Sequence, residues 1–149
     1  MKGRKMLKSL VFGLSLLLFA GCATVVSEEA QSEVQKEMAK EQKMGEDMLE
    51  SFRKKDFAGY TRYIPAGGRQ VYSKADFDKE QRELLSRMGE IVSYRFLTRL
   101  EMEPVHQLVW AVRFKSYNLK GEPIFREALF CIVVGEVDES KRVFLFGFK

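Results

Sequence analysis

The spacing of apolar residues changes at Glu90, from the period of a helix to that of a strand. Up to that point apolar residues recur every three or four positions, as in Met44, Met48, Leu49 and Phe52. Such spacing is typical of a helix with one buried face. After Glu90, apolar and polar residues alternate, which indicates half-buried strands. Helices followed by a sheet predict an α+β domain.

Two further helices are expected before the sheet. Asp56 can cap a short second helix, and Ile64-Pro65-Ala66-Gly67-Gly68 then breaks the chain, because proline disfavours helix before it and the glycines loosen the residues after them. Ser73 and Asp76 resemble a capping box, with Asp in place of Glu. We expect the helix that they open to end at Gly89.

Four strands are expected after Glu90, joined by short turns. Their apolar residues lie within residues 90–100, 108–114, 124–134 and 143–148. Short connections favour an antiparallel meander of four strands. One face of the first two strands is apolar and the other charged, so helices should cover one side only. The third predicted strand contains Cys131, which we expect to be a small buried hydrophobic residue.

The first 22 residues combine a basic start, an apolar run and a cysteine. Four cations precede residue 10, about eleven apolar residues follow, and Gly21 stands directly before Cys22. An apolar run of this length suits a secretory signal and is too short to cross a bilayer. The stretch Leu17-Leu18-Phe19-Ala20-Gly21-Cys22 resembles the lipobox of bacterial prolipoproteins. It departs from that pattern at Phe19, where the family prefers Leu.

The resemblance implies cleavage after Gly21 and a lipid anchor on Cys22. It divides the chain into a signal peptide (1–21), a lipid-anchored polar stalk (22–41) and a single domain (42–149). Ala23 follows the cysteine, where many diderm bacteria use Asp to retain a lipoprotein at the inner membrane. By that family rule the protein should lie in the outer membrane, facing the periplasm. With Cys22 lipidated, Cys131 would have no partner for a disulfide.

The charge of the chain changes once the signal is removed. The whole chain has 25 Lys and Arg against 21 Asp and Glu, but four of the cations and none of the acids precede Cys22. The mature chain therefore has a formal charge of zero, which argues against a nucleic-acid partner. Its one dense basic cluster, Arg53-Lys54-Lys55, should close a helix, where cations offset the dipole.

The stalk is rich in Glu, Gln, Lys and Ala. Val34 and Met38 begin a helical stripe that Glu41 interrupts. We interpret the stalk as helical and mostly solvated, with disorder as the alternative. Because it offers few apolar residues, we expect a chain beginning near Gln42 to fold as stably as the full one.

The predicted order of elements resembles the nuclear-transport-factor-2-like group of cone-shaped domains. The resemblance covers about residues 42–149 and includes Gly89-Glu90-Ile91-Val92 at the start of the sheet and the terminal Phe146-Gly147-Phe148. No residue signature distinguishes it from a cystatin-like sheet with helices on one face. Some domains of this cone fold isomerise or hydrate small molecules, using an acid–base residue and a phenol inside the cavity.

The chain lacks the usual motifs of catalysis and metal binding. It has no Gly-rich phosphate loop, no His-Glu-x-x-His, no Cys-x-x-Cys and only one His. We therefore expect no metal and no cofactor. Four residues are candidate ligand-binding residues because of their place on the strands: Tyr94, His106, Trp110 and Arg126.

Each candidate also has a structural interpretation. His106 could act as a base and Tyr94 as a hydrogen-bond donor, or they could be a surface His and a core Tyr. Trp110 should lie at the centre of the core or pocket, opposite Tyr94 or Phe96. Arg126 and Glu127 point to opposite faces of a regular strand, so one of these two charges should face the helices and need a partner.

The sequence thus predicts a membrane-anchored lipoprotein with a non-enzymatic binding or interaction domain. Its partners would be membrane lipid and a small acidic ligand or an envelope protein. An isomerase or dehydratase that uses the cone cavity is one alternative. A structural envelope protein that forms a homodimer through its sheet is another.

Overall fold

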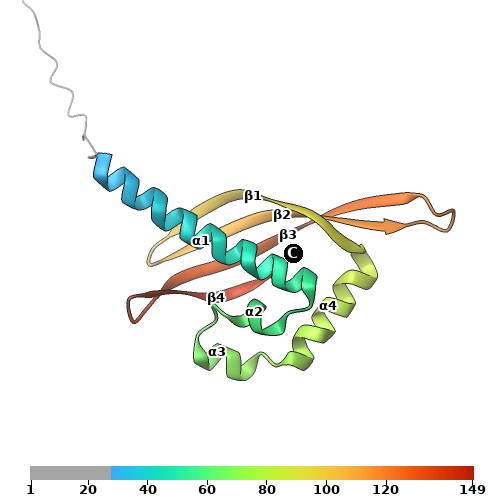
Figure 1. The fold of residues 1–149 in the computed structure, drawn as a ribbon, viewed down its shortest axis with the longest axis horizontal. Coiled ribbons are helices and arrows are strands. Elements are labelled where there is room, and N and C mark those ends of the chain that lie inside the picture. Colours follow the sequence, from blue (N-terminus) through green and yellow to red (C-terminus); the bar gives the residue numbers. More distant parts are fainter. Residues whose placement is uncertain (1–27) are drawn as a thin grey trace, which may run out of the picture.

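The computed structural model describes residues 28–149 and has four helices followed by four strands (Figure 1). The helices are α1 (Glu28–Lys54), α2 (Phe57–Thr61), α3 (Ala66–Val71) and α4 (Lys74–Met88). The strands are β1 (Glu90–Met102), β2 (Val105–Tyr117), β3 (Pro123–Val137) and β4 (Ser140–Phe148). The predicted α+β class is therefore confirmed. The expected signal peptide and Cys22 lie outside the described residues.

Helix α1 continues without a break across residues 41 and 42, where the sequence suggested that a stalk meets a domain. Its first part, through Lys40, is mostly exposed, as expected of a solvated helix. Its second part buries one face that includes Met44, Met48 and Phe52. The helix ends at Lys54, and Lys55 takes a left-handed conformation with φ 61°. Arg53 and Lys54 occupy its last turn, as predicted.

Helices α2 and α4 begin at the side-chain caps that the sequence indicated. The Asp56 side chain accepts from the Gly59 amide at 3.0 Å and begins α2. Ser73 and Asp76 form the expected capping box of α4, which ends at Gly89 with φ 93°. The segment after Pro65 was expected to be irregular but forms α3. Proline already has a helical φ, so a helix can start directly after it.

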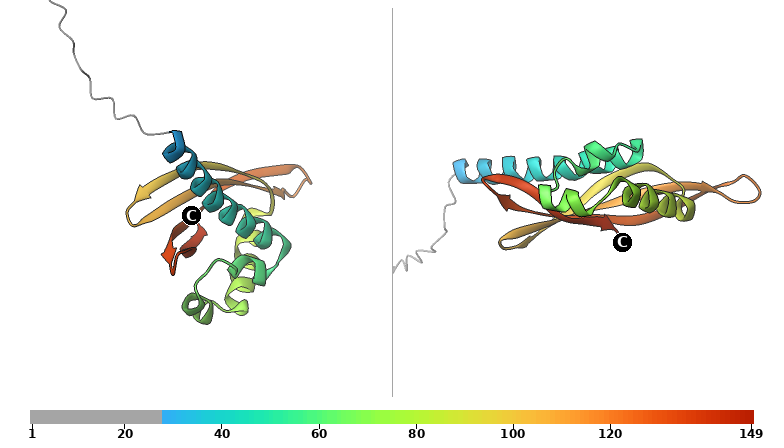
Figure 2. Two further views of the ribbon diagram at one scale, coloured as in Figure 1. Left: turned by 60° about the vertical axis from the view of Figure 1, so that its left-hand side comes forward. Right: turned by 90° about the horizontal axis from the view of Figure 1, so that it is seen from below.

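The sheet is a meander in the order β1-β2-β3-β4, with every neighbouring pair antiparallel. It curls around helices that lie on one of its faces (Figure 2). The hairpin of β2 and β3 extends past the helices, so its tip is exposed on both faces. On the outer edge of β4, the Val143 amide donates to the Tyr63 carbonyl at 3.0 Å.

Two irregularities in β1 change which residues face the helices. The register with β2 shifts between Ile91 and Ser93 and again between Phe96 and Thr98. A bulge moves the following side chains to the opposite face. The alternation of apolar and polar residues within 90–100 puts Leu100 with the inward-facing apolar residues and Arg99 with the outward-facing polar ones, and the structure shows the reverse. Leu100 is 47% exposed, whereas the Arg99 side chain is only 7% exposed.

The core is aromatic and fills the space between helices and sheet. Its largest fully buried side chains are Trp110, Tyr60, Phe52, Phe77, Phe114 and Phe130. Their rings meet at tilted or edge-on angles, with centroids 5.1 Å apart for Tyr60 and Phe77 and 5.7 Å for Phe52 and Phe77. Such pairs add about 0.5–1.5 kcal/mol beyond their burial.

Candidate functional site

Trp110 lies in the middle of this core and not in an open pocket. It is fully buried, stands opposite Phe96 in the sheet register, and meets the Phe96 ring edge-on at 5.4 Å between centroids. The predicted aromatic pair across the first hairpin is therefore present. The indole Nε1 has no hydrogen-bond partner among the described residues. Helix α1 approaches the indole so closely at Gly45 that a Cβ there would overlap the ring.

Tyr94 and Arg126 are far less buried than Trp110. Tyr94 is half-buried beside α1, and burial, with Glu50 nearby, raises the pKa of its hydroxyl. Arg126 is exposed and donates to the Ser116 hydroxyl at 2.8 Å. Glu127 is exposed too, so neither charge faces the helices. The expectation of a buried charge fails because the hairpin extends past the helical layer.

His106 belongs to a buried ionic cluster that links α1 to the sheet. Glu41, fully buried on α1, accepts from Arg99 Nε through Oε2 and contacts His106 Nδ1 through Oε1, both at 2.8 Å. The His106 side chain is 15% exposed. The interpretation of His106 as a surface residue was therefore wrong, because β1 and β2 place it under the helix.

In the same cluster, both nitrogens of the His106 imidazole contact a carboxylate. His106 Nε2 lies 3.1 Å from Oε2 of Glu101, and Arg99 pairs with Glu101 as well. A general base needs a ring nitrogen that can reach the proton of a substrate. Here each nitrogen already faces a carboxylate, so the arrangement favours a bridge between α1 and the sheet.

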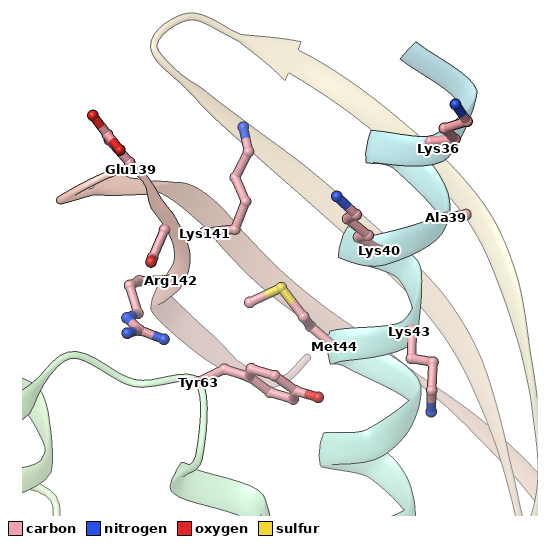
Figure 3. Close-up of a pocket in the computed structure, with 10 residues that line it drawn as sticks. Lys36, Ala39, Lys40, Lys43, Met44, Tyr63, Glu139, Lys141 and Arg142 are labelled. Atoms are coloured by element: carbon pink, nitrogen blue, oxygen red, sulfur yellow. The ribbon is translucent and has the colours of Figure 1, made fainter. Parts of the chain in front are cut away.

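A groove beside this cluster carries a concentration of positive charge. It lies between α1 and the start of β4 and has a volume of about 770 Å³ (Figure 3). Five of its ten lining residues are cations: Lys36, Lys40, Lys43, Lys141 and Arg142. Glu139 is the one carboxylate in the lining. We call it the basic groove.

The cations of the basic groove differ in their partners. Lys43 pairs with Asp47 at 2.7 Å, and this contact raises the pKa of Lys43. Lys141 lies 2.8 Å from Glu37 and 3.6 Å from Glu41, and its hydrogen bond to Glu37 raises its pKa. It therefore belongs to both the groove and the edge of the buried cluster.

Two of the five cations have no carboxylate within ion-pair distance among residues 31–149. These are Lys40 on α1 and Arg142 on β4. Figure 3 shows the Lys40 and Lys141 side chains extending toward the gap between the two walls, with Met44 and Tyr63 below them. The site thus has charged walls and a partly apolar floor.

A tight turn builds the β4 wall. Asp138 and Glu139 connect β3 to β4, and both have positive φ, 49° and 59°. Two left-handed residues in succession are typical of a two-residue hairpin that follows the twist of its strands. The turn places Lys141 and Arg142, directly after it, along the groove on the β4 side (Figure 3).

Sequence reasoning missed the basic groove because its walls are about a hundred residues apart in the chain. One signal was present: Lys36, Lys40 and Lys43 are spaced by four and three, which places them on one side of a helix. The expected stalk, which contains Lys36 and Lys40, was interpreted as mostly solvated, so this spacing was not connected to a site.

Within the described residues, the structure shows neither a metal site nor a membrane-spanning helix. No cluster of three or more His, Cys, Asp or Glu side chains there is placed to hold a metal ion. Across residues 28–149, no helix is long and apolar enough to span a membrane.

No family model and no curated protein matches this chain. Solved structures with a similar arrangement include the association domain of CaMKII from C. elegans, at 15% identity and a TM-score of 0.48, covering 83% of this chain and 99% of that one. Aln2 from a Streptomyces species is similar at 14% identity and 0.46, covering 83% and 91%. An NTF2-like protein from Campylobacter jejuni is similar at 13% and 0.41, covering 70% and 96%. These likenesses assign no activity to this chain.

Proposed function

We propose that this protein is a lipid-anchored, non-enzymatic binding protein of the bacterial envelope, and that its basic groove binds an anionic ligand. The observation that carries the ligand proposal is the pair Lys40 and Arg142. They stand on opposite walls of one groove and have no carboxylate partner among the described residues. An anion between them would gain charge-assisted hydrogen bonds without first displacing a protein carboxylate.

The filled core supports a binding role over catalysis. Cavity chemistry of the isomerase type needs an ionisable pair that faces a substrate. Here the space under the helices is occupied by aromatic side chains, and Glu41 and His106 are engaged with each other at 2.8 Å. The remaining cluster members surround both ring nitrogens of His106.

A titration with inorganic pyrophosphate tests the ligand proposal. The probe is small and multiply charged, and calorimetry on the lipidated protein in a neutral detergent measures its affinity. We expect Lys40→Ala and Arg142→Ala each to weaken binding by about tenfold, the equivalent of one charge-assisted contact. Lys79→Ala, at an exposed site on α4, should leave the affinity unchanged. An affinity that is equal in all four proteins would contradict the proposal.

The anchor has a separate test. The proposal of an anchor rests on the resemblance of residues 17–22 to a lipobox. Several acyl chains give stable attachment to a membrane, whereas one chain alone binds only marginally. We expect the protein to incorporate labelled palmitate and to fractionate with the outer membrane. Cys22→Ala should abolish the label. A Cys22→Ala protein that still carried the label would exclude this cysteine as the lipidated residue.

The open face of the sheet supports a second candidate, a homodimer that forms through the sheet. The registers align Leu100, Gln107, Val133 and Leu145 in one row across all four strands. Leu145 is 67% exposed. Leu129, four residues before Val133 on β3 and on the same face, is 42% exposed. Apolar patches exposed on a protein surface mark interaction sites, and these leucines share one face of the sheet.

Sedimentation of the lipidated protein in detergent measures whether such a dimer exists. Leu145→Asp should convert a dimer to a monomer, because it places a charge within the contact. Val71→Asp is the matched control, since Val71 is 81% exposed on α3, away from the sheet. A wild-type protein that sediments as a monomer at all concentrations would exclude this candidate.

A further inference from the structure

The basic groove lies close to the expected lipid anchor along the chain. From Cys22 to the start of α1 at Glu28 there are six residue steps, so the two are at most about 20 Å apart. Lys36 lies eight residues further, about 12 Å along the helix. If Cys22 is acylated, the first cation of the groove therefore lies within roughly 30 Å of the membrane that holds the acyl chains.

The exposed part of α1 carries its cations along one edge. Lys36 and Lys43 have side chains that are 66% and 71% exposed, and Lys40, which is also exposed, lies between them. Glu33 contacts Lys36 at 3.3 Å, and Asp47 contacts Lys43. The two ends of this edge are thus partly neutralised. Its middle, at Lys40, has no carboxylate partner among residues 31–149 and keeps its charge.

We infer that the basic groove docks on the phosphate groups of anionic phospholipids in the membrane that carries the anchor. The inference rests on the proposed function, because it names the anion that the groove binds. A phospholipid offers a phosphate for the unpaired cations Lys40 and Arg142, which both line the groove. Basic side chains near an anionic surface are attracted to it within about a Debye length.

Docking of this kind orients the domain and is not needed for attachment. Several acyl chains already hold a lipoprotein in the bilayer. The groove would instead bring α1 against the surface and turn the β2–β3 hairpin, at the opposite end of the molecule in Figure 1, away from it. The suitable readout is therefore the accessibility of particular lysines, since total membrane binding would not change.

The experiment reconstitutes the lipidated full-length mature protein on the outside of vesicles and measures the rate at which an amine reagent acetylates each lysine. One set of vesicles contains phosphatidylcholine alone, and the other also contains phosphatidylglycerol. We expect acetylation of Lys40 to slow by at least about threefold on the anionic vesicles. Lys120, at the exposed tip of the β2–β3 hairpin, is the internal control and should react equally on both. Salt at about 0.5 M should remove the difference.

A third arm separates the lipid from a soluble anion. Inorganic pyrophosphate is added to the protein on phosphatidylcholine vesicles. Protection of Lys40 by pyrophosphate but not by phosphatidylglycerol would overturn the lipid inference and leave the proposed function intact. Protection in neither arm would overturn both. Protection by phosphatidylglycerol, reversed by salt, supports both.

Arg142→Gln tests whether both walls of the groove take part. The variant keeps the backbone of β4 and removes one of the two unpaired cations. Lys40 should then lose its protection on anionic vesicles, whereas Lys79→Gln on α4 should leave it in place. An unchanged melting temperature shows that Arg142→Gln is folded. Full protection of Lys40 in the folded variant would overturn docking through the groove.

Discussion

Glu41 and Arg99, 58 positions apart in the sequence, form an ion pair that joins α1 to β1. Oε2 of Glu41 lies 2.8 Å from Nε of Arg99, and both side chains are almost completely shielded from water. His106 and Lys141 complete the surroundings of the carboxylate. A buried charge of this kind depends on its partners, because desolvation costs several kcal/mol for an ion without them.

Glu41→Ala should therefore destabilise the protein strongly. It leaves Arg99 with Glu101, which is exposed, as its remaining carboxylate among the described residues, and it removes one carboxylate from His106. Breaking a buried pair on one side typically costs about 3–5 kcal/mol. Glu33→Ala is the matched control, since its pair with Lys36 is exposed and contributes at most about 1 kcal/mol. Urea unfolding measures both, and equal midpoints would contradict this role for Glu41.

Glu41 also changes the expectation for a shortened chain. The composition of residues 22–41 suggested that a protein beginning at Gln42 would be as stable as the full chain. The buried carboxylate leads us to expect the opposite, because the truncation removes Glu41 together with the first half of α1. A chain beginning at Glu33 should melt near the parent temperature. The chain beginning at Gln42 should melt many degrees lower, and similar melting temperatures would restore the original expectation.

The sequence predicted the fold well because period alone separates helix from strand. The change at Glu90, the Ser73 capping box and the four-strand meander all depend on local patterns of a few residues. The core position of Trp110 followed from the same alternation. Such features are visible in one stretch of chain at a time.

The candidate site was not predictable in the same way. The bulges in β1 turn Arg99 inward, but the alternation of apolar and polar residues along β1 does not indicate them. Glu41 did leave one: it lies three residues after Met38 and three before Met44, on the face that α1 buries. A carboxylate in a polar segment is usually solvated, so this signal was interpreted as the end of the stripe. The basic groove depends on two distant segments meeting.

Gly45 tests how closely α1 approaches the sheet. A Cβ at this position would overlap the Trp110 ring, so Gly45→Ala forces the helix or the indole to move. We expect a loss of about 1–2 kcal/mol, which is the cost of overpacking less the helix propensity that alanine gains. Gly67→Ala in α3 adds a Cβ with no neighbour within 4 Å and should be neutral or slightly stabilising. Thermal unfolding compares the two, and a stabilised Gly45→Ala would show that the contact is loose.

Glu50 should contribute a small acid-dependent part of the stability. Hydrogen bonds from Arg53 and Lys54 lower the pKa of its carboxyl from 4.5 to about 2. The contribution is thus complete above pH 4.5 and is lost as the pH falls toward 2. Because both cations are mostly exposed, we expect at most about 1 kcal/mol. Glu50→Gln should flatten the fall in melting temperature below pH 4.5, and an unchanged fall would contradict this role for Glu50.

Two tyrosines near the same helices should respond oppositely to loss of the hydroxyl. Tyr60 is fully buried, and its hydroxyl has no hydrogen-bond partner among the described residues. Tyr63 donates to Oδ2 of Asp47 at 2.6 Å. Removing an unsatisfied buried hydroxyl relieves a desolvation cost, so Tyr60→Phe should be neutral or stabilising. Tyr63→Phe deletes a bond to a charged group and should cost about 1 kcal/mol or more. Urea unfolding of both variants measures the difference. A destabilised Tyr60→Phe would show that the Tyr60 hydroxyl has a partner in solution, such as a buried water.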